Sequence, residues 1–319
     1  MPALIPAREA GSIIFNGQSG HSSQPLRPIM QRARQIAIVG MAVSAFLAIM
    51  KLTVGWFAHS AALSADGFES AADVFASGLV LGGLILAARP ADENHPYGHG
   101  RVETLAGLLV GFILLAAGCV IAWHGLTGVA ETDQVPHSYA VWPLIISILV
   151  KLALVGVKYR EGRRIGSAAL VADAAHDSID ILSGTVALTA LSLALASPQR
   201  FLRADHYGAF CVGLIVIVTG LRVMHDASLH LMDTMPDDAS LQQIRTVAMS
   251  VTDVAGVEKC FARKTGLRYH VDLHLEVDPQ MTVLASHEIA GRVRDRIREQ
   301  VPWVADVLVH VEPFPGALK

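Results

Sequence analysis

The chain has 319 residues, of which 52% are hydrophobic and 17% are charged, and its formal net charge is −3. Soluble globular proteins carry about 25% charged residues, so this composition argues against an ordinary cytosolic enzyme. No basic surface is expected for binding nucleic acid. Three cysteines, Cys119, Cys211 and Cys260, are too few and too widely spaced for a disulfide framework or a cysteine-based zinc module.

The charged residues are unevenly distributed along the chain. Residues 236–319 hold 22 of the 53 acidic and basic residues. This predicts a membrane domain over residues 35–235, followed by a soluble domain over residues 236–319. Residues 1–34 lack the ordered features of a signal peptide and are rich in Gly, Ser, Gln and Pro, so we expect a mobile cytoplasmic tail there.

Six apolar stretches are long enough to cross the bilayer. About 30 Å of hydrocarbon requires roughly 20 helical residues. The stretches lie at residues 35–57, 62–88, 103–127, 138–157, 166–195 and 206–230. The sequence therefore predicts an α-helical membrane protein with six transmembrane helices, surrounded by lipid.

Lysine and arginine in the loops predict the orientation, because cytoplasmic loops carry an excess of both. One set of loops holds six basic residues and the other holds two: Arg89, Arg101, Lys158, Arg160, Arg163 and Arg164 against Arg200 and Arg203. We expect both termini in the cytoplasm and place the protein in a bacterial inner (plasma) membrane.

In the soluble segment, the hydrophobic residues follow the periods of short helices and strands. Residues 238–250 and 282–300 follow the helical period, and residues 257–263, 268–277 and 304–312 follow the strand period. Thr282 is a suitable cap for the second helix. The order αββαβ predicts a ferredoxin-like α+β domain. Because about 80 residues make a small core, dimerisation would stabilise it.

Ionisable residues inside two spans are the most informative feature. A charge at the middle of the bilayer costs roughly 2.5–3.5 kcal/mol, and such residues usually mark an ion pathway. "ADGFESAAD" in the second span and "ADAAHDSID" in the fifth share one pattern, displaced by 107 residues. The spacing i, i+3, i+7 places each trio on one helical face. The trios are Asp66, Glu69 and Asp73, and Asp173, His176 and Asp180, with Asp177 beside the second.

Because spans two and five run in opposite directions, the duplication suggests an inverted repeat. At about 1.5 Å per residue, Glu69, Asp73, His176 and Asp180 can meet at one level. Three carboxylates and one imidazole there make a tetrahedral site for a divalent cation. Helix-packing polar groups, counter-ions to buried bases and a metal-free proton relay are the alternatives. The absence of Lys and Arg from both spans favours the metal site.

Two further clusters have the residue types of metal sites. The loop "RPADENHPYGHGRVE" holds Asp92, His95 and His99 around turn-forming Pro96 and Gly98, although a solvated loop with incidental histidines is the alternative. The second cluster is a set of residues in the soluble domain. Periodicity does not show that these residues meet, so they are either metal ligands or ordinary surface residues. The set is His274, His287, His310 and Glu312.

Together these features resemble the cation diffusion facilitator family over residues 35–313. The resemblance implies a homodimer that exports Zn²⁺ or another divalent transition metal in exchange for protons. It implies a transport site, a loop site, a cytoplasmic site that also includes Glu258, and an interdomain salt bridge. The implied transport site consists of Glu69, Asp73, His176 and Asp180, and the implied loop site consists of Asp92, His95 and His99. The implied cytoplasmic site consists of Glu258, His274, His287, His310 and Glu312. The implied salt bridge joins Arg101 and Asp233.

Two residues depart from the family pattern. Glu69 stands where His or Asp is more common, and Glu258 stands where a His ligand is common. Both changes favour harder ions, so Fe²⁺, Mn²⁺ and Co²⁺ stand beside Zn²⁺ as candidates. Cd²⁺ is a further candidate substrate. "SHEIAG" lacks the second His of a metalloprotease HExxH motif, so we expect no enzyme. A non-transporting membrane metal sensor or scaffold is the alternative function.

Overall fold

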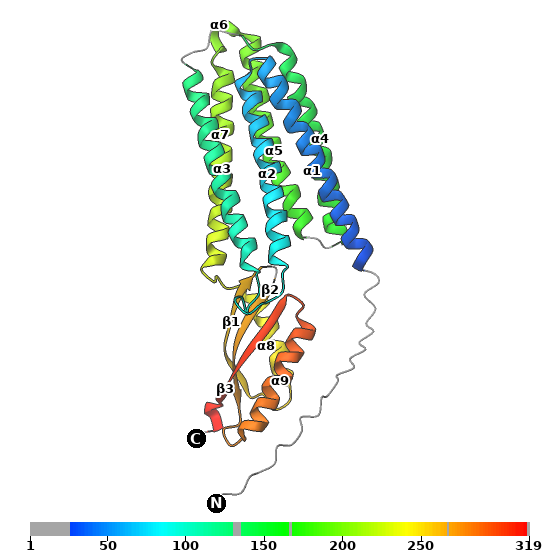
Figure 1. Cartoon of the computed structure of the whole chain (residues 1–319), viewed down its shortest axis with the longest axis vertical. Helices are drawn as coiled ribbons and strands as arrows, with labels where there is room; N and C mark the ends of the chain where they lie inside the picture. Colours follow the sequence, from blue (N-terminus) through cyan, green and yellow to red (C-terminus); the bar gives the residue numbers. More distant parts are fainter. Residues whose placement is uncertain (1–25, 130–134, 166–167, 267, 318–319) are drawn as a thin grey trace, which may run out of the picture.

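The computed structural model describes residues 26–129, 135–165, 168–266 and 268–317. A tall helical bundle stands on a small domain of strands and helices (Figure 1). Six helices in the described part are long and apolar enough to cross a membrane, as the sequence predicts. The bundle consists of α1 (Leu26–Phe57), α2 (Ala61–Ala87), α3 (Arg101–Gly128), α4 (Val141–Ile165), α5 (Ala168–Ala196) and α7 (Ala204–Leu231), with the short elements η1 (Ser138–Ala140) and α6 (Pro198–Phe201) between them.

Two helices extend well beyond their predicted spans, by eight residues or more. α1 begins at Leu26, so residues 26–34 are helical although we predicted a tail over 1–34; residues 1–25 lie outside the described part. Pro28 falls in the first turn, where its missing N–H removes no helical hydrogen bond. α4 continues to Ile165 instead of ending at residue 157. The predictions located where hydrophobicity ends, whereas a helix continues until its backbone is capped or broken.

α3 and α7 are packed backbone to backbone. A β-carbon at Gly118 would lie 2.7 Å from the amide nitrogen of Ile217, and one at Gly213 would lie 2.5 Å from that of Ala122. Small residues at such positions let two membrane helices approach closely. This pair forms one side of the bundle, α1 and α4 form the other, and α2 and α5 lie between them (Figure 1).

The first turn of α2 is fixed by a buried aspartate from α7. Asp205 accepts hydrogen bonds from the backbone N–H of Ala61 (2.5 Å) and from Ser60 Oγ (2.9 Å). Ser60 caps the helix by accepting from the N–H of Leu63. A carboxylate at a helix N-terminus satisfies exposed donors and opposes the positive end of the helix dipole. Asp205 thereby holds the start of the acid-bearing helix against α7.

The soluble domain has the predicted order αββαβ. It comprises α8 (Asp238–Met249), β1 (Gly256–Thr265), β2 (Arg268–Val277), α9 (Val283–Gln300) and β3 (Val304–Pro313), followed by the short turn η2 (Pro315–Ala317). The sheet order is β1-β2-β3, antiparallel between β1 and β2 and parallel between β2 and β3. Thr282 caps α9 as predicted, because its hydroxyl accepts from the N–H of Ala285.

The two faces of β2 differ in environment. Val271, Leu273, Leu275 and Val277 are buried beneath α8 and α9, which supply apolar side chains to the same core. The alternate residues of the strand, including His274, face away from that core and are only partly buried. The strand period therefore separates a hydrophobic core from a polar outer face, on which the histidines lie.

Candidate metal sites

Asp73 of α2 and His176 and Asp180 of α5 form an intramembrane cluster. Each offers one ligand atom, and these three atoms lie within 4.8 Å of one another. His176 Nε2 lies 3.4 Å from Asp73 Oδ1; the His176 side chain is 39% exposed and that of Asp73 is 13% exposed. Asp180 is buried. Nitrogen and oxygen donors at this separation can close around one divalent cation.

Glu69 lies one turn before Asp73 but outside that three-atom group. Its carboxylate is buried and interacts electrostatically with Asp180, Asp66 and Asp73. Glu69 Oε2, Asp73 Oδ2 and Asp180 Oδ1 are buried oxygens with no hydrogen-bond partner among the described residues. Because buried polar atoms are normally paired, such oxygens are consistent with a site that receives a cation.

Buried lysines from neighbouring helices form ion pairs with acids of the two trios. Lys51 Nζ of α1 lies 2.7 Å from Asp66 Oδ2 and donates to Ser70 Oγ at 3.0 Å, with Lys51 and Asp66 almost fully buried. Using the absence of bases from spans two and five to disfavour counter-ions was therefore wrong, both for Asp66 and for the acids of α5 that pair with lysines of α4. The bases lie in spans one and four, which pack against the acidic helices.

α4 supplies two more buried cations to α5. Lys151 Nζ lies 2.7 Å from Asp177 Oδ1 and 2.5 Å from Asp180 Oδ2. Lys158 contacts Asp177 as well, and lies 2.8 Å from Asp173 Oδ2. Lys158 was counted as a loop residue in the prediction of orientation, but it belongs to α4 and is only 3% exposed. Four acids each contact a lysine: Asp66, Asp173, Asp177 and Asp180. The described residues offer no lysine partner for Glu69 or Asp73.

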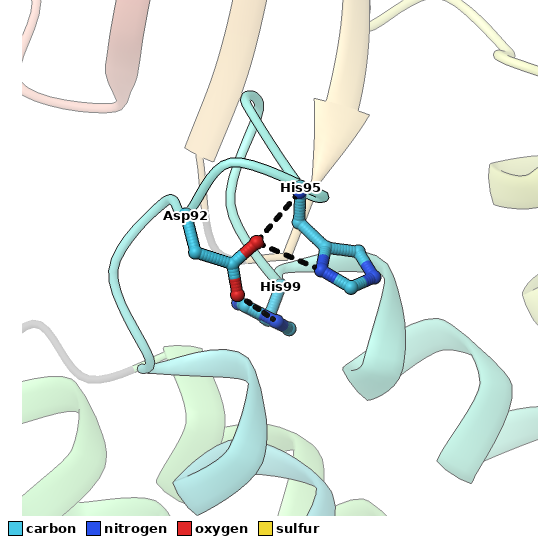
Figure 2. A group of neighbouring side chains, drawn as sticks. All are labelled: Asp92, His95 and His99. Carbon is cyan, nitrogen blue, oxygen red and sulfur yellow. Dashed lines mark hydrogen bonds and ion pairs between the residues drawn. The ribbon is translucent and has the colours of Figure 1, made fainter.

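Asp92, His95 and His99 gather in the loop between α2 and α3, as Figure 2 shows. Asp92 Oδ1 accepts a hydrogen bond from the backbone N–H of His95 (2.7 Å) and lies 3.0 Å from His95 Nδ1. His99 Nε2 lies 3.4 Å from Asp92 Oδ2. The loop turns at Gly98, whose φ of +80° favours glycine. The predicted loop cluster is thus brought together.

The hydrogen bonds of this loop leave a ring nitrogen and a carboxylate in forms that can bind a metal. His99 Nδ1 lies 3.2 Å from the carbonyl oxygen of Pro90. Since a carbonyl only accepts, Nδ1 carries the proton, and Nε2 of the neutral ring keeps a lone pair. The backbone N–H of His95, and then its ring, hold the pKa of Asp92 below its usual value, so the carboxylate is ionised at neutral pH.

The same loop touches the soluble domain. Tyr97 packs edge-on against His270 of β2, with ring centroids 5.9 Å apart, and the Arg263 guanidinium of β1 lies 5.5 Å from the Tyr97 ring centre. A β-carbon at Gly100 would lie 2.7 Å from the carbonyl oxygen of Thr265. The end of the loop is therefore in close backbone contact with the turn after β1.

A third cluster lies on the outer face of the sheet. His274 and His310 are paired in the parallel register of β2 and β3. His274 Nδ1 lies 2.5 Å from Glu312 Oε1, and His310 Nε2 lies 3.7 Å from the same oxygen. A hydrogen bond with Glu258, followed by one with His274, lowers the pKa of Glu312. Three of the five predicted cytoplasmic ligands are thus brought into one group, whereas Glu258 and His287, which is exposed on α9, are not in it.

The predicted interdomain pair is in contact. Arg101 Nη2 donates to Asp233 Oδ1 at 3.0 Å, and both side chains are about half exposed. Asp233, the second residue after α7, adopts a φ of +56°, a backbone conformation that aspartate tolerates better than most residues. The contact ties the start of α3 to the connection between α7 and α8.

The sequence reasoning missed Lys51, Lys151 and Asp205. The expense of a charge inside the membrane applies to lysine as much as to aspartate. Lys51 and Lys151 lie within the predicted first and fourth spans, so the same test would have found both. Asp205 lay one residue before the predicted sixth span, and nothing in the sequence indicates its contact with α2.

Two protein-family descriptions together cover most of the chain. Residues 37–232 match the cation efflux transmembrane domain, and residues 236–314 match the cation efflux protein cytoplasmic domain. Solved structures titled "MamM-CTD H285A" resemble the soluble part, with 28% identity and a TM-score of 0.24 over 24% of this chain and 96% of that one.

Similar proteins come from a plant and from bacteria. The Arabidopsis thaliana "Metal tolerance protein C1" is 31% identical over 93% of this chain, which spans 66% of that protein. The Bacillus subtilis "Manganese efflux system protein MneP" is 27% identical over 89% of this chain and 97% of its own length. The Pectobacterium atrosepticum "Cation-efflux pump FieF" is 29% identical over 87% and 91%. The chain therefore belongs to the cation diffusion facilitator family, whose members are multi-pass membrane proteins that transport metal cations.

Proposed function

We propose that the chain exports a divalent transition-metal cation in exchange for protons, as a homodimer. The observation that carries this proposal is the convergence of Asp73, His176 and Asp180 from the two antiparallel repeat helices. We assign Glu69 as the fourth ligand, because its unpartnered buried oxygen lies one turn from Asp73. Zn²⁺ and Fe²⁺ are the first candidates, with Mn²⁺, Co²⁺ and Cd²⁺ after them.

The transport step follows from competition at these ligands. Open to the cytoplasm, the deprotonated ligands take one metal ion. Open to the opposite side, they meet protons that compete with the metal, because metal ligands must be deprotonated. His176 suits this exchange, because a protonated imidazole has no lone pair left for a metal. The duplicated motif favours alternating access around one fixed site.

The orientation proposed above keeps both termini in the cytoplasm of a bacterium. Lys158 no longer counts toward it, because its charge is paired with Asp173 and Asp177. Five of the six predicted inner residues still outnumber Arg200 and Arg203, and Arg27, Arg32 and Arg34 precede the first span. The loop site and the cytoplasmic site would then face cytoplasmic metal and act as regulators of the dimer.

The test is metal uptake into proteoliposomes that carry a pH gradient, run separately with Zn²⁺, Fe²⁺, Mn²⁺ and Co²⁺. The parent protein should move at least one of these ions, at a rate that depends on the gradient. Asp180→Ala removes one ligand and should abolish transport, while Asp233→Asn, outside the site, should leave measurable transport. Parent vesicles without uptake would instead favour the metal sensor or scaffold, and an active Asp180→Ala protein of normal abundance would contradict the site.

A further inference from the structure

Lys151 brings a positive charge into direct contact with the proposed metal ligand Asp180. Its ammonium lies 2.5 Å from Asp180 Oδ2 and 2.7 Å from Asp177 Oδ1, and it donates to Ser44 Oγ of α1 at 3.1 Å. The side chains of Lys151, Asp177 and Asp180 are each no more than 5% exposed. Water screens such a charge poorly, so a cation at the site would feel it strongly.

The two oxygens of Asp180 are used differently. Oδ2 contacts Lys151, whereas Oδ1 is buried with no hydrogen-bond partner among the described residues. A metal ion can therefore bind through Oδ1 while the lysine stays on Oδ2. Lys151 also keeps its second carboxylate, Asp177, when the metal binds. The geometry thus gives a metal-loaded site with a lysine still in place, instead of a lysine that the metal displaces.

The charges around the site explain why such a lysine is useful. When they are ionised, the carboxylates of Glu69, Asp73 and Asp180 attract a divalent ion strongly in a medium of low dielectric constant. A transport site must bind its ion well enough to load and weakly enough to release it. Lys151 offsets one of these negative charges at short range. By Coulomb's law it repels a divalent ion twice as strongly as a proton in the same place.

We propose that Lys151 is a positioning residue whose fixed charge, acting through Asp180, limits the affinity of the transport site for divalent cations and so permits their release. This inference rests on the proposed function of the same site. The proposed role and a purely structural role predict opposite changes in metal affinity when Lys151 is replaced. A lysine that only supports the fold would weaken metal binding when removed, whereas a lysine that limits affinity would strengthen it.

The test compares neutral replacements of Lys151 in the full-length protein. Asp92→Ala and His274→Ala are introduced first, so that the loop and cytoplasmic sites do not contribute to binding. In that background, Lys151→Met should lower the Kd for Zn²⁺ by at least about tenfold and lower both KM and kcat for Zn²⁺ uptake. Lys151→Gln, which keeps hydrogen-bond donors but no charge, should behave in the same way. Lys151→Arg should stay close to the background protein.

Lys158→Met is the matched control, because Lys158 lies on the same helix and shares the partner Asp177 but does not contact a proposed ligand. It should change the Kd for Zn²⁺ by less than about threefold, since charge effects fall with distance. Unchanged or weaker Zn²⁺ binding by both Lys151→Met and Lys151→Gln, or equal tightening by Lys158→Met, would overturn the inference. Asp180→Ala separates the two proposals: Zn²⁺ binding that survives Asp180→Ala would remove the transport site itself.

Discussion

The guanidinium of Arg101, the first residue of α3, lies 3.0 Å from the carboxylate of Asp233, the second residue after α7. The pair joins the two helices whose glycine-rich seam is tightly packed, at the end of the bundle that meets the soluble domain. Exposed ion pairs contribute only about 0–1 kcal/mol to stability. We therefore expect its effect on the arrangement of the domains to exceed its effect on folding.

Charge exchange tests this pair. Arg101→Asp and Asp233→Arg should each reduce metal transport, because each places two like charges together. The double variant restores opposite charges and should recover part of the loss. The measurement is proteoliposome uptake at equal protein abundance. A double variant whose loss equals the sum of the two single losses would show that the residues do not interact.

His176→Asp tests the choice of metal at the transport site. The substitution keeps a ligand but leaves only carboxylates, which favour harder ions. Zn²⁺ uptake should therefore fall more than Mn²⁺ uptake, by about tenfold or more in the ratio of the two kcat/KM values. The pH dependence of the rate should also shift to lower pH, because a carboxylate replaces the imidazole. An unchanged Zn²⁺ to Mn²⁺ ratio would argue against His176 as a ligand.

Lys51 and Asp66 should contribute to stability without binding metal. Lys51→Met leaves a buried carboxylate without its cation, and breaking a buried pair typically costs about 3–5 kcal/mol. The Tm of the purified protein and its abundance in the membrane should fall. Lys51→Met combined with Asp66→Asn removes both charges and should regain most of the lost Tm. If Lys51→Met leaves the Tm unchanged, the pair is not structural.

The isolated soluble domain, residues 236–319, should bind metal through the outer face of its sheet. It has its own hydrophobic core, so the fragment is expected to fold. Zn²⁺ should raise its Tm, because a ligand that binds only the folded state stabilises it. His274→Ala should abolish the rise. His287→Ala is the control, since His287 lies outside the cluster in one chain; loss of binding in that variant would instead place His287 in a shared site of a dimer.

Acid should weaken the same domain through Glu312. Its folded-state pKa lies below the ordinary value of 4.5, because of its hydrogen bonds with Glu258 and His274. The associated stability is present above that ordinary value and is lost as the pH falls through the lowered pKa. In thermal unfolding of the metal-free fragment, Glu312→Gln should reduce the drop in Tm between neutral and acid pH. Parallel curves for parent and variant would contradict this account.

The six spans were predictable because each is a long apolar stretch. The αββαβ domain was predictable because its elements keep regular helix and strand periods. The members of the acidic trios were also identifiable, since charges in apolar segments are conspicuous. Their division into paired and unpaired acids was not predictable from α2 and α5 alone. It depends on Lys51, Lys151 and Lys158, which reach those helices only through tertiary packing. Periodicity likewise could not bring His274 to Glu312, because the contact requires the parallel register of β2 and β3.

The contact at Gly100 has a mechanical consequence. α2, which carries Asp73, leads directly into the loop that ends at this glycine, and a β-carbon there would lie 2.7 Å from the carbonyl oxygen of Thr265. The glycine thus lets the two backbones approach more closely than any side chain at position 100 would allow. We expect a shift of α2 along its axis to reach the turn that joins β1 to β2 through this contact.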